Sequence, residues 1–234
     1  MFPYEPEIEV EKNFRVSYQE VLKYVWPLLT EERRSKITRV ASERNFNISV
    51  VLENLFDRGN TSAVMRSQEA LGFGSVEVIE GGDRFKHARR VSSGAEKWLR
   101  MRKWSKTTDC WKQLKAEGYQ ICVTSLKSSK PINEVDWSRP TALVLGNEKE
   151  GVSEEILEQA DERIIIPMVG FVQSLNISVA GAVSLYHIAQ TLTAKTGRVA
   201  TVTEEQIEIL KAHYALSTLD SGPQVLRANI LNSR

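Results

Sequence analysis

The sequence predicts an α/β fold with a mainly parallel sheet flanked by helices. Apolar runs rich in β-branched residues alternate along the chain with segments of helical length, an order typical of βαβ units. Two of these runs, Thr141–Leu145 and residues 163–166, lead directly into polar loops at residues 146–151 and 167–176. Short apolar runs bounded by Gly or Pro indicate strands buried on both faces of a parallel sheet. Because such sheets bind ligands at the carboxyl ends of their strands, we expect the functional site in these two loops.

The two ends of the chain are expected to be helical. Residues 17–26 and 31–44 have helical patterns, and Pro27 separates them. Near the other end, the Thr-Glu-Glu-Gln run that starts at Thr203 has the form of a capping box and predicts a helix over about residues 204–215. We therefore expect an N-terminal helical arm at residues 1–45, a central domain at residues 46–196 and a C-terminal helical extension at residues 197–234.

Strands and helices alternate within the central domain. Val, Ile and Leu runs predict the strands, Ser or Thr marks helix starts, and Gly marks helix ends. The expected elements are a strand at 48–52, a helix from Thr61 or Ser62 to Leu71, a strand at 76–79, a helix at 108–117, strands at 119–124, 141–145 and 163–166, and a helix after Asn176. Residues 81–92, which open with Gly-Gly-Asp, are expected to be irregular.

The composition is that of an ordinary globular protein, with 234 residues, 41% hydrophobic and 26% charged. No apolar run approaches the roughly 20 residues that span a bilayer, and the N-terminus has neither a signal-peptide core nor a transit-peptide bias. The two cysteines and three histidines show no disulfide framework and no metal-ligand spacing. We therefore expect a cytoplasmic protein with no bound metal and no membrane association. Organelle import stays open if the N-terminus has been trimmed.

Positive charge is concentrated in two segments, although the net charge is only +1. From Arg84 to Lys106 there are nine Lys and Arg residues against one acid, and a second basic set lies within residues 33–44. Such clustering indicates a polyanion partner, usually RNA or DNA, while a solvated face is the alternative. Trp98 and Trp104 lie among the basic residues and favour nucleic acid. The candidate RNA contacts are Arg34, Arg39, Arg44, Arg84, Lys86, Arg89, Arg90 and Lys97.

A helix over residues 60–71 would place Arg66 in a stripe of small residues. Ala63, Ser67 and Ala70 share its face by helical spacing. An arginine in such a stripe, close to a helix start, is placed to bind an anion. From this segment alone, an ordinary surface arginine is the alternative.

The two loops offer different chemistry. Residues 146–151 begin and end with Gly, which lets the backbone approach a ligand closely, and Glu148 could contact that ligand. The loop lacks a P-loop ending and the chain has no GxGxxG, so an ordinary loop with Ser153 capping the next helix stays open. The second loop ends in Gln-Ser-Leu-Asn at Asn176, a candidate N-cap. Small residues in the helix that follows allow close approach to the sheet or to a second subunit.

Together these segments resemble a known family. The three motifs of the SpoU class of SPOUT methyltransferases match, in order and spacing, the segments ENLFDRGNTSAVMRSQEALG, ALVLGNEKEGVSEE and IIIPMVGFVQSLNISVAGAVSLY. The resemblance covers about residues 37–195, and the three motifs together are specific. Within the class, the helical ends and the SSGAEKW segment at residues 92–98 are most similar to the TrmH type.

The resemblance implies an RNA ribose 2′-O-methyltransferase that uses S-adenosylmethionine and, for the TrmH type, methylates the D-loop guanosine at position eighteen of tRNA. It also implies a C-terminal deep trefoil knot and a homodimer. The catalytic roles that it assigns fall on Arg66, Asn60, Glu148, Ser174 and Asn176. The cofactor contacts that it implies, mostly through backbone groups, are Thr124, Leu145, Gly146, Glu148, Ile166, Met168, Ser174 and Leu175.

The expected reaction is an in-line displacement in which a ribose 2′-oxygen attacks the sulfonium methyl carbon. The family's proposal makes the counterpart of Arg66 the base, but a guanidinium does not readily lose a proton. Our hypothesis is that Arg66 grips the adjacent phosphate and stabilises the developing alkoxide, while a phosphate oxygen or water takes the proton. The chain departs from many bacterial members at residues 57–59, Asp-Arg-Gly, where those members have a bulkier and more basic stretch. We expect this departure to affect RNA placement rather than methyl transfer.

Three alternatives stay open at this point. The same chemistry could act on ribosomal RNA or on the tRNA wobble nucleotide, although the helical ends favour the D-loop guanosine. A non-catalytic RNA-binding module with the same fold is disfavoured because the motif side chains are all present. A nucleotide-dependent dehydrogenase is disfavoured by the missing Gly-rich fingerprint.

Overall fold

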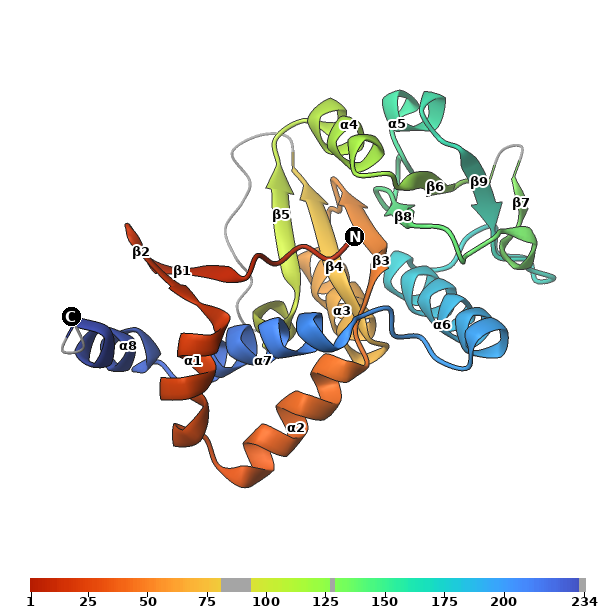
Figure 1. The fold of residues 1–234 in the computed structure, drawn as a ribbon. Helices are drawn as coiled ribbons and strands as arrows, with labels where there is room; N and C mark the ends of the chain where they lie inside the picture. Colours follow the sequence, from red (N-terminus) through yellow and green to blue (C-terminus); the bar gives the residue numbers. More distant parts are fainter. Residues whose placement is uncertain (81–93, 127–128, 232–234) are drawn as a thin grey trace. The chain divides into compact units, whose positions relative to one another are not determined.

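The computed structural model describes residues 1–80, 94–126 and 129–231 (Figure 1) and divides into two compact units. Asn45–Val199, together with Met1, form the first, which we call the sheet unit. Phe2–Arg44 and Ala200–Arg234 form the second, the helical unit. The two ends of the chain, treated above as separate parts, therefore belong to one unit.

The sheet unit contains one seven-stranded sheet with the strand order β5-β4-β3-β8-β6-β9-β7. Each of its pairings is parallel, so the mainly parallel α/β fold predicted from the sequence is confirmed. The strands are β3 (Asn45–Glu53), β4 (Phe73–Ile79), β5 (Arg100–Trp104), β6 (Gln120–Thr124), β7 (Lys130–Pro131), β8 (Thr141–Leu145) and β9 (Glu162–Ile165). In the centre, β3 and β8 are paired as far as Leu52 opposite Leu145, so their carboxyl ends meet at one edge.

The central strand β8 is buried on both faces, as its apolar run predicts. Leu143 and Leu145 belong to one hydrophobic cluster, and Ala142 and Val144 belong to another. The two clusters lie on opposite faces because successive side chains of a strand alternate. The sheet is therefore the middle of three layers.

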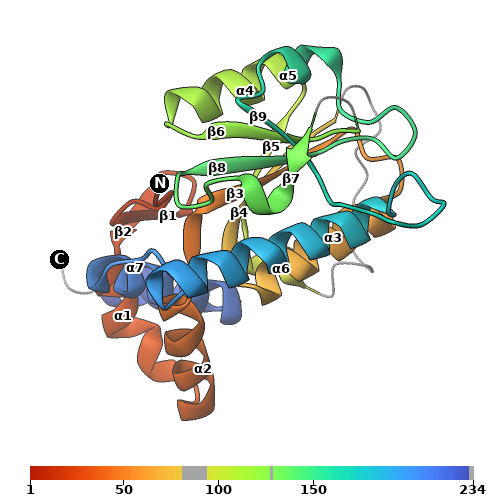
Figure 2. The same cartoon turned by 90° about the vertical axis from the view of Figure 1, so that its right-hand side faces the viewer.

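Helices cover both faces of this sheet (Figure 2). On one face lie α3 (Arg58–Ala70) and α6 (Ile177–Thr196), and on the other lie α4 (Thr107–Ala116) and α5 (Glu154–Glu158). A Cβ atom added at Gly181 of α6 would lie 3.0 Å from Leu145 Cδ1 and 3.1 Å from Val64 Cγ2. The absent side chain lets α6 approach β8 and α3 closely, which confirms the close approach to the sheet that its small residues predict.

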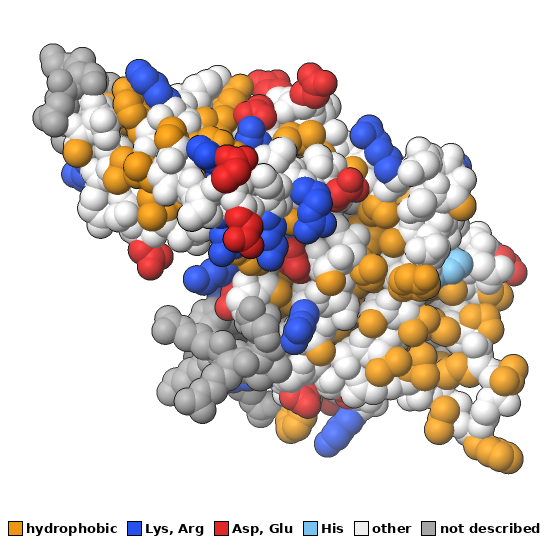
Figure 3. Space-filling view, turned by 90° about the horizontal axis from the view of Figure 1, so that it is seen from below, with side chains coloured by type: hydrophobic (Ala, Val, Ile, Leu, Met, Phe, Trp, Pro, Cys, Tyr) orange, Lys and Arg blue, Asp and Glu red, His pale blue; other side chains and the backbone are white. Residues whose placement is uncertain are grey.

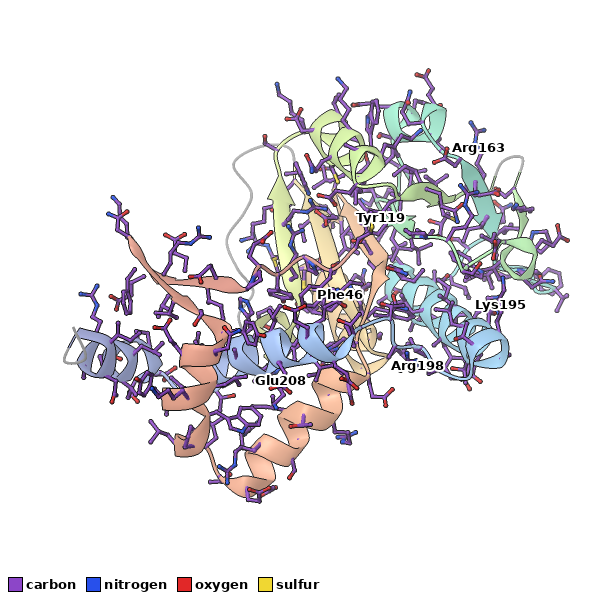
Figure 4. The ribbon with its side chains drawn as sticks, viewed as in Figure 1. Phe46, Tyr119, Arg163, Lys195, Arg198 and Glu208 are labelled. Carbon is purple, nitrogen blue, oxygen red and sulfur yellow. The ribbon has the colours of Figure 1, made fainter. Side chains whose placement is uncertain are left out.

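A hydrogen bond from Tyr119 and the packing of the Phe46 ring fix the start of β3 (Figure 4). The Tyr119 hydroxyl donates to the Phe46 carbonyl oxygen at 2.6 Å, and burial raises the pKa of that hydroxyl. A Cβ atom at Gly74 would lie 2.3 Å from Phe46 Cε1, so the ring needs glycine beneath it. The neighbouring strands β3 and β4 are thereby held together where they begin.

Two strands of this sheet, β5 and β7, were not predicted. The sequence of β5 is basic, but both of its arginines are paired inside the unit. Arg102 forms ion pairs with Glu77, whose side chain is fully buried, and with Glu117. The Trp104 indole N–H donates to Glu77 at 2.6 Å. Part of the basic run, together with the indole N–H of Trp104, therefore serves the structure.

Two further features differ from the sequence prediction, the start of α3 and the burial of β9. The helix α3 starts at Arg58 with Asp57 as its cap, because the Asp57 carboxylate accepts the Gly59 N–H at 2.7 Å, whereas the expected start was Thr61 or Ser62. In β9 only Ile164 is fully buried, so the prediction of a strand buried on both faces is wrong there. The described helices η2 (Ala95–Trp98) and η3 (Ile132–Glu134) are short 3₁₀ turns.

The helical unit combines both ends of the chain. Its elements are the antiparallel hairpin of β1 (Glu7–Glu11) and β2 (Phe14–Ser17), the helices α1 (Tyr18–Tyr24), η1 (Trp26–Leu28) and α2 (Glu31–Ser42), and the C-terminal helices α7 (Glu204–Thr218) and α8 (Gly222–Leu231). The hairpin and α8 were not predicted, whereas the capping box at Thr203 is confirmed. No described helix in either unit is long and apolar enough to cross a membrane.

Candidate functional site

Three segments meet at the carboxyl edge of the central strands in the sheet unit. Residues 54–60 follow β3, residues 146–151 follow β8, and Asn176 begins α6. The parallel pairing of β3 with β8 places the first two segments side by side. The site is built from hydrogen bonds among these three segments.

Glu148 joins the β8 loop to the β3 loop. Its carboxylate accepts the backbone N–H of Phe56 at 2.8 Å, the backbone N–H of Asp57 at 3.3 Å and the Asn60 side-chain amide at 2.9 Å. Partial desolvation raises the pKa of Glu148, but these hydrogen bonds outweigh it and hold the pKa below its usual value. The group is therefore a carboxylate that fixes a backbone.

Asn60 and Asn176 extend this network to the third segment. The Asn176 side-chain amide donates to Asn60 Oδ1 at 3.3 Å, while Asn60 donates in turn to Glu148. Asn176 Oδ1 also accepts the Ser178 backbone N–H at 2.8 Å, which confirms Asn176 as the N-cap of α6. One asparagine thus caps a helix and positions a neighbouring motif.

Asn147, which the sequence interpretation missed, shapes the β8 loop. Its Oδ1 accepts the backbone N–H groups of Lys149 and Glu150, and its Nδ2 donates to the Asn54 carbonyl at 2.8 Å. Its backbone pairs with Gly151, whose φ of 74° favours glycine. An Asn whose side chain bonds the backbone two residues on is a recognised turn signal, and it could have identified this residue.

Glu53, which the sequence interpretation also missed, binds Ser153, just after the β8 loop. Its carboxylate is 1% exposed and accepts the Ser153 N–H at 2.9 Å, the Ser153 hydroxyl at 2.6 Å and the Thr107 hydroxyl at 2.9 Å. Ser153 in turn caps α5, as predicted. The ends of β3, α4 and α5 are therefore tied to one buried acid. No periodicity marks such a residue, because it stands at the end of an apolar strand.

Two of the expected catalytic residues lie outside this network. Arg66 is exposed on α3, six residues beyond Asn60, which corresponds to a rise of about 9 Å along the helix axis. Ser174 is exposed in the segment between β9 and α6. The structure thus brings together Asn60, Glu148 and Asn176 and leaves the other two open to solvent.

The expected cofactor contacts share one edge of the sheet. Thr124 ends β6, and its hydroxyl donates to the Val144 carbonyl at 3.1 Å. Leu145 and Gly146 are buried where β8 ends, and a Cβ atom at Gly146 would lie 2.3 Å from the Gly151 carbonyl carbon. The remaining contacts are half-buried, apolar and located after β9; they are Ile166, Met168 and Leu175. Because β8, β6 and β9 are neighbours in the sheet, these groups can face a single ligand.

The expected RNA contacts have different surroundings. Arg39 and Lys97 are exposed, and Arg34 pairs with Glu31 one turn away at 2.6 Å. Arg44 is 1% exposed, and its Nε donates to the Tyr214 hydroxyl at 2.9 Å inside the helical unit. The expectation of Arg44 as an RNA contact is therefore wrong. Four further residues, Arg84, Lys86, Arg89 and Arg90, lie outside the described residues.

Known proteins carry the same pattern. The model of the SpoU rRNA Methylase family matches residues 47–186. A tRNA (guanosine(18)-2'-O)-methyltransferase of Thermus thermophilus is 38% identical over 169 residues, which cover 72% of this chain and 87% of that protein.

Solved structures agree with these sequence relatives. The A. aeolicus TrmH/SpoU tRNA modifying enzyme superimposes with a TM-score of 0.73 at 33% identity, covering 81% of this chain and 98% of the other. An AdoMet-bound rRNA methyltransferase from Sinorhizobium meliloti superimposes with a TM-score of 0.58 at 25% identity, covering 67% and 60%. The family match spans all three segments of the site, and the chain belongs to the SpoU rRNA Methylase family.

Proposed function

We propose that this protein transfers a methyl group from S-adenosylmethionine to a tRNA ribose 2′-hydroxyl, that of guanosine 18 in the D-loop. The observation that carries the proposal is the hydrogen-bonded network of Asn60, Glu148 and Asn176, which joins the three motif segments of the family. Relatives with 35–38% identity have this activity in their names. The target follows from those relatives, and the site chemistry follows from the network.

The residues at the carboxyl edge fit S-adenosylmethionine. Gly146 lets the backbone of Gly151 and Val152 pack directly against the end of β8, and Ile166, Met168 and Leu175 provide half-buried apolar surface for an adenosine group. Bound there, the cofactor supplies an activated methyl group on its sulfonium. The residues that would hold it are those named above, with Thr124 and Leu145 at the neighbouring strand ends and Glu148 and Ser174 beside them.

The side chains of the site have different roles in the proposed reaction. Glu148 accepts three hydrogen bonds from the β3 loop, so its role is to position that loop and it is not the proton acceptor. Asn60 and Asn176 hold the third motif against the first. Arg66 binds the phosphate next to the target ribose with its planar fork and stabilises the 2′-oxygen as its proton leaves. A phosphate oxygen or a water accepts the proton.

We further infer that the protein works as a homodimer and that the segment after β9 forms the trefoil knot of the family. The dimer is supported by an apolar stripe on α6, where Val179, Val183 and Tyr186 are 47%, 41% and 58% exposed. Their spacing places them on one face of the helix. Hydrophobic side chains gather on the α6 side of the molecule in Figure 3, and such surfaces mark contacts with partners. The motif-one helix of one subunit would then supply Arg66 to the cofactor pocket of the other.

The division of the chain suggests a division of roles. We propose that the sheet unit performs methyl transfer and that exposed basic residues, among them Arg39 and Lys97, help to bind tRNA. The location in the cell is expected to be cytoplasmic, and a tRNA in that compartment would be the substrate.

The decisive experiment is incubation with unmodified tRNA and labelled S-adenosylmethionine, followed by mapping of the methylated nucleotide. We expect a single 2′-O-methylguanosine at position 18 and at least a hundredfold loss in the Arg66→Lys variant, which keeps the charge but loses the fork. Methylation of ribosomal RNA or of the wobble nucleotide instead would overturn the target. Absence of cofactor binding in calorimetry would mark a non-catalytic RNA-binding module.

A further inference from the structure

An exposed aromatic ring stands at the border of the site. Phe56 is 69% exposed, although a packed aromatic side chain contributes a large share of core stability. Its backbone is nevertheless fixed, because its N–H and that of Asp57 are both bound by the Glu148 carboxylate. The network that builds the site therefore also anchors the backbone that carries this exposed ring.

A cation accompanies the ring from the neighbouring loop. Lys149 Nζ lies 5.3 Å from the centroid of the Phe56 ring, a cation–π distance. Lys149 is itself exposed, and its backbone N–H is fixed by Asn147 Oδ1 at 2.9 Å. Ring and ammonium thus come from two loops that are joined through Glu148.

From this arrangement we propose that Phe56 and Lys149 form a stacking platform for an unpaired nucleobase of the RNA, close to the methylated ribose. The inference rests on the proposed function, because it requires RNA at this edge of the sheet. A planar ring accepts any base by stacking, and a neighbouring ammonium can pair with the phosphate of the same nucleotide.

The cation distinguishes this ring from a subunit contact. The stripe of Val179, Val183 and Tyr186 on α6 is apolar and suits burial against another protein surface. Covering Phe56 with such a surface would also desolvate the Lys149 ammonium beside it, which is costly without a counter-charge. A nucleotide supplies both a flat apolar face and an anion, so it fits the pair.

The test compares Phe56→Leu with Phe56→Trp in the full-length protein. Leucine keeps the apolar volume and removes the planar face, whereas tryptophan keeps the face. We expect Phe56→Leu to weaken equilibrium binding of unmodified tRNA about tenfold and to raise KM for tRNA in parallel, and Phe56→Trp to bind tRNA as well as the wild type does. The affinity for S-adenosylmethionine should not change in either variant. Lys149→Gln should reduce the slope of tRNA affinity against salt by about one.

Three results would overturn the platform. They are unchanged tRNA affinity in Phe56→Leu, an equal loss of cofactor affinity, and a shift of the variant from dimer to monomer at working concentration. Because tRNA binding is measured without turnover, the proposed function can fail separately. If Phe56→Leu binds tRNA more weakly than the wild type and Phe56→Trp binds it equally well, but the wild type does not methylate tRNA, the platform is supported and the proposed reaction is refuted.

Discussion

Two loops at the carboxyl edge of the sheet, residues 146–151 after β8 and residues 167–175 after β9, are held in different ways. The first is bound to the chain by Glu148 and by Asn147, which together receive five hydrogen bonds from backbone and side chains. In the part of the chain that the structure describes, residues 167–175 form no such bonds. Three of their apolar side chains are exposed, Val169 by 106%, Phe171 by 109% and Val172 by 65%.

The difference indicates what each loop is for. A loop with satisfied polar groups is complete within one chain, and it can position Asn60 before any ligand arrives. A loop with exposed apolar side chains and unbound backbone groups awaits a partner that covers them. We interpret the first loop as the preassembled part of the site and the second as the part that cofactor and second subunit complete. The following predictions test this distinction, from the largest expected effect to the smallest.

Removing the Glu148 carboxylate should release the preassembled loop. We expect Glu148→Ala to lower kcat/KM for tRNA methylation about a hundredfold, because a small misplacement of catalytic groups carries such a cost. The protein should remain folded, with an unchanged far-ultraviolet circular dichroism spectrum. Glu150→Ala, in the same loop and also exposed, is the matched control and should retain activity. Equal losses in both variants would contradict the role assigned to Glu148.

A charge on the α6 stripe should disrupt the part that a second subunit completes. Val183→Glu is expected to raise the dimer dissociation constant by tenfold or more, because a buried unpaired charge is costly. Sedimentation velocity measures this constant directly. Ala116→Glu, an exposed position on α4, is the control and should leave the dimer intact. A Val183→Glu dimer as tight as the wild type would remove the stripe from the interface.

Two substitutions of Asn176 separate its role as the cap of α6 from its role in positioning Asn60. Asn176→Ala loses both the cap of α6 and the hydrogen bond to Asn60, and we expect its unfolding free energy to fall by about 1 kcal/mol. Asn176→Asp keeps a capping oxygen and loses only the donor, so its stability should stay near that of the wild type while its activity falls. Chemical denaturation measures the first quantity, and the methylation rate measures the second. Full activity in Asn176→Asp would show that the Asn60 contact is dispensable.

The contribution of Glu148 to the unfolding free energy should change little with pH, and it should only fall as the pH is lowered. The pKa of Glu148 in the folded protein lies below its usual value of 4.5. Its contribution to stability is therefore fully present above about pH 4.5 and is lost as the pH falls through the lower folded value. The difference in unfolding free energy between wild type and Glu148→Gln should shrink as pH falls below that point. A difference that grows on acidification would contradict the assigned direction.

Much of this site follows from the sequence, and the exceptions have physical causes. The strand β8, the cap at Ser153 and the cap at Asn176 follow from local patterns, because each depends on residues within a few positions. Glu53 depends on Ser153, a hundred positions away, so no local pattern identifies it. Glu148 was singled out from its loop, but its positioning role was not predicted because its partners come from another strand's loop.

The fold shows the same division between local and distant causes. The strand β5 was missed because its arginines are typical of a solvated face, and they become part of a strand only when Glu77 of β4 neutralises them. Arg44 was misjudged for a similar reason, since Tyr214 provides its partner from the far end of the chain. The assignment of Arg66 and Ser174 came from family resemblance, and in the single chain both are exposed.

Hydrogen exchange of the two loops, with and without S-adenosylmethionine, tests the central distinction most directly. We predict that the amides of Lys149, Glu150 and Gly151 are protected in the free protein, because each is already hydrogen-bonded. The amides of residues 167–175 should exchange rapidly in the free protein and become protected when the cofactor binds. Equal protection of both loops in the free protein, or no change at residues 167–175 on cofactor binding, would contradict the account.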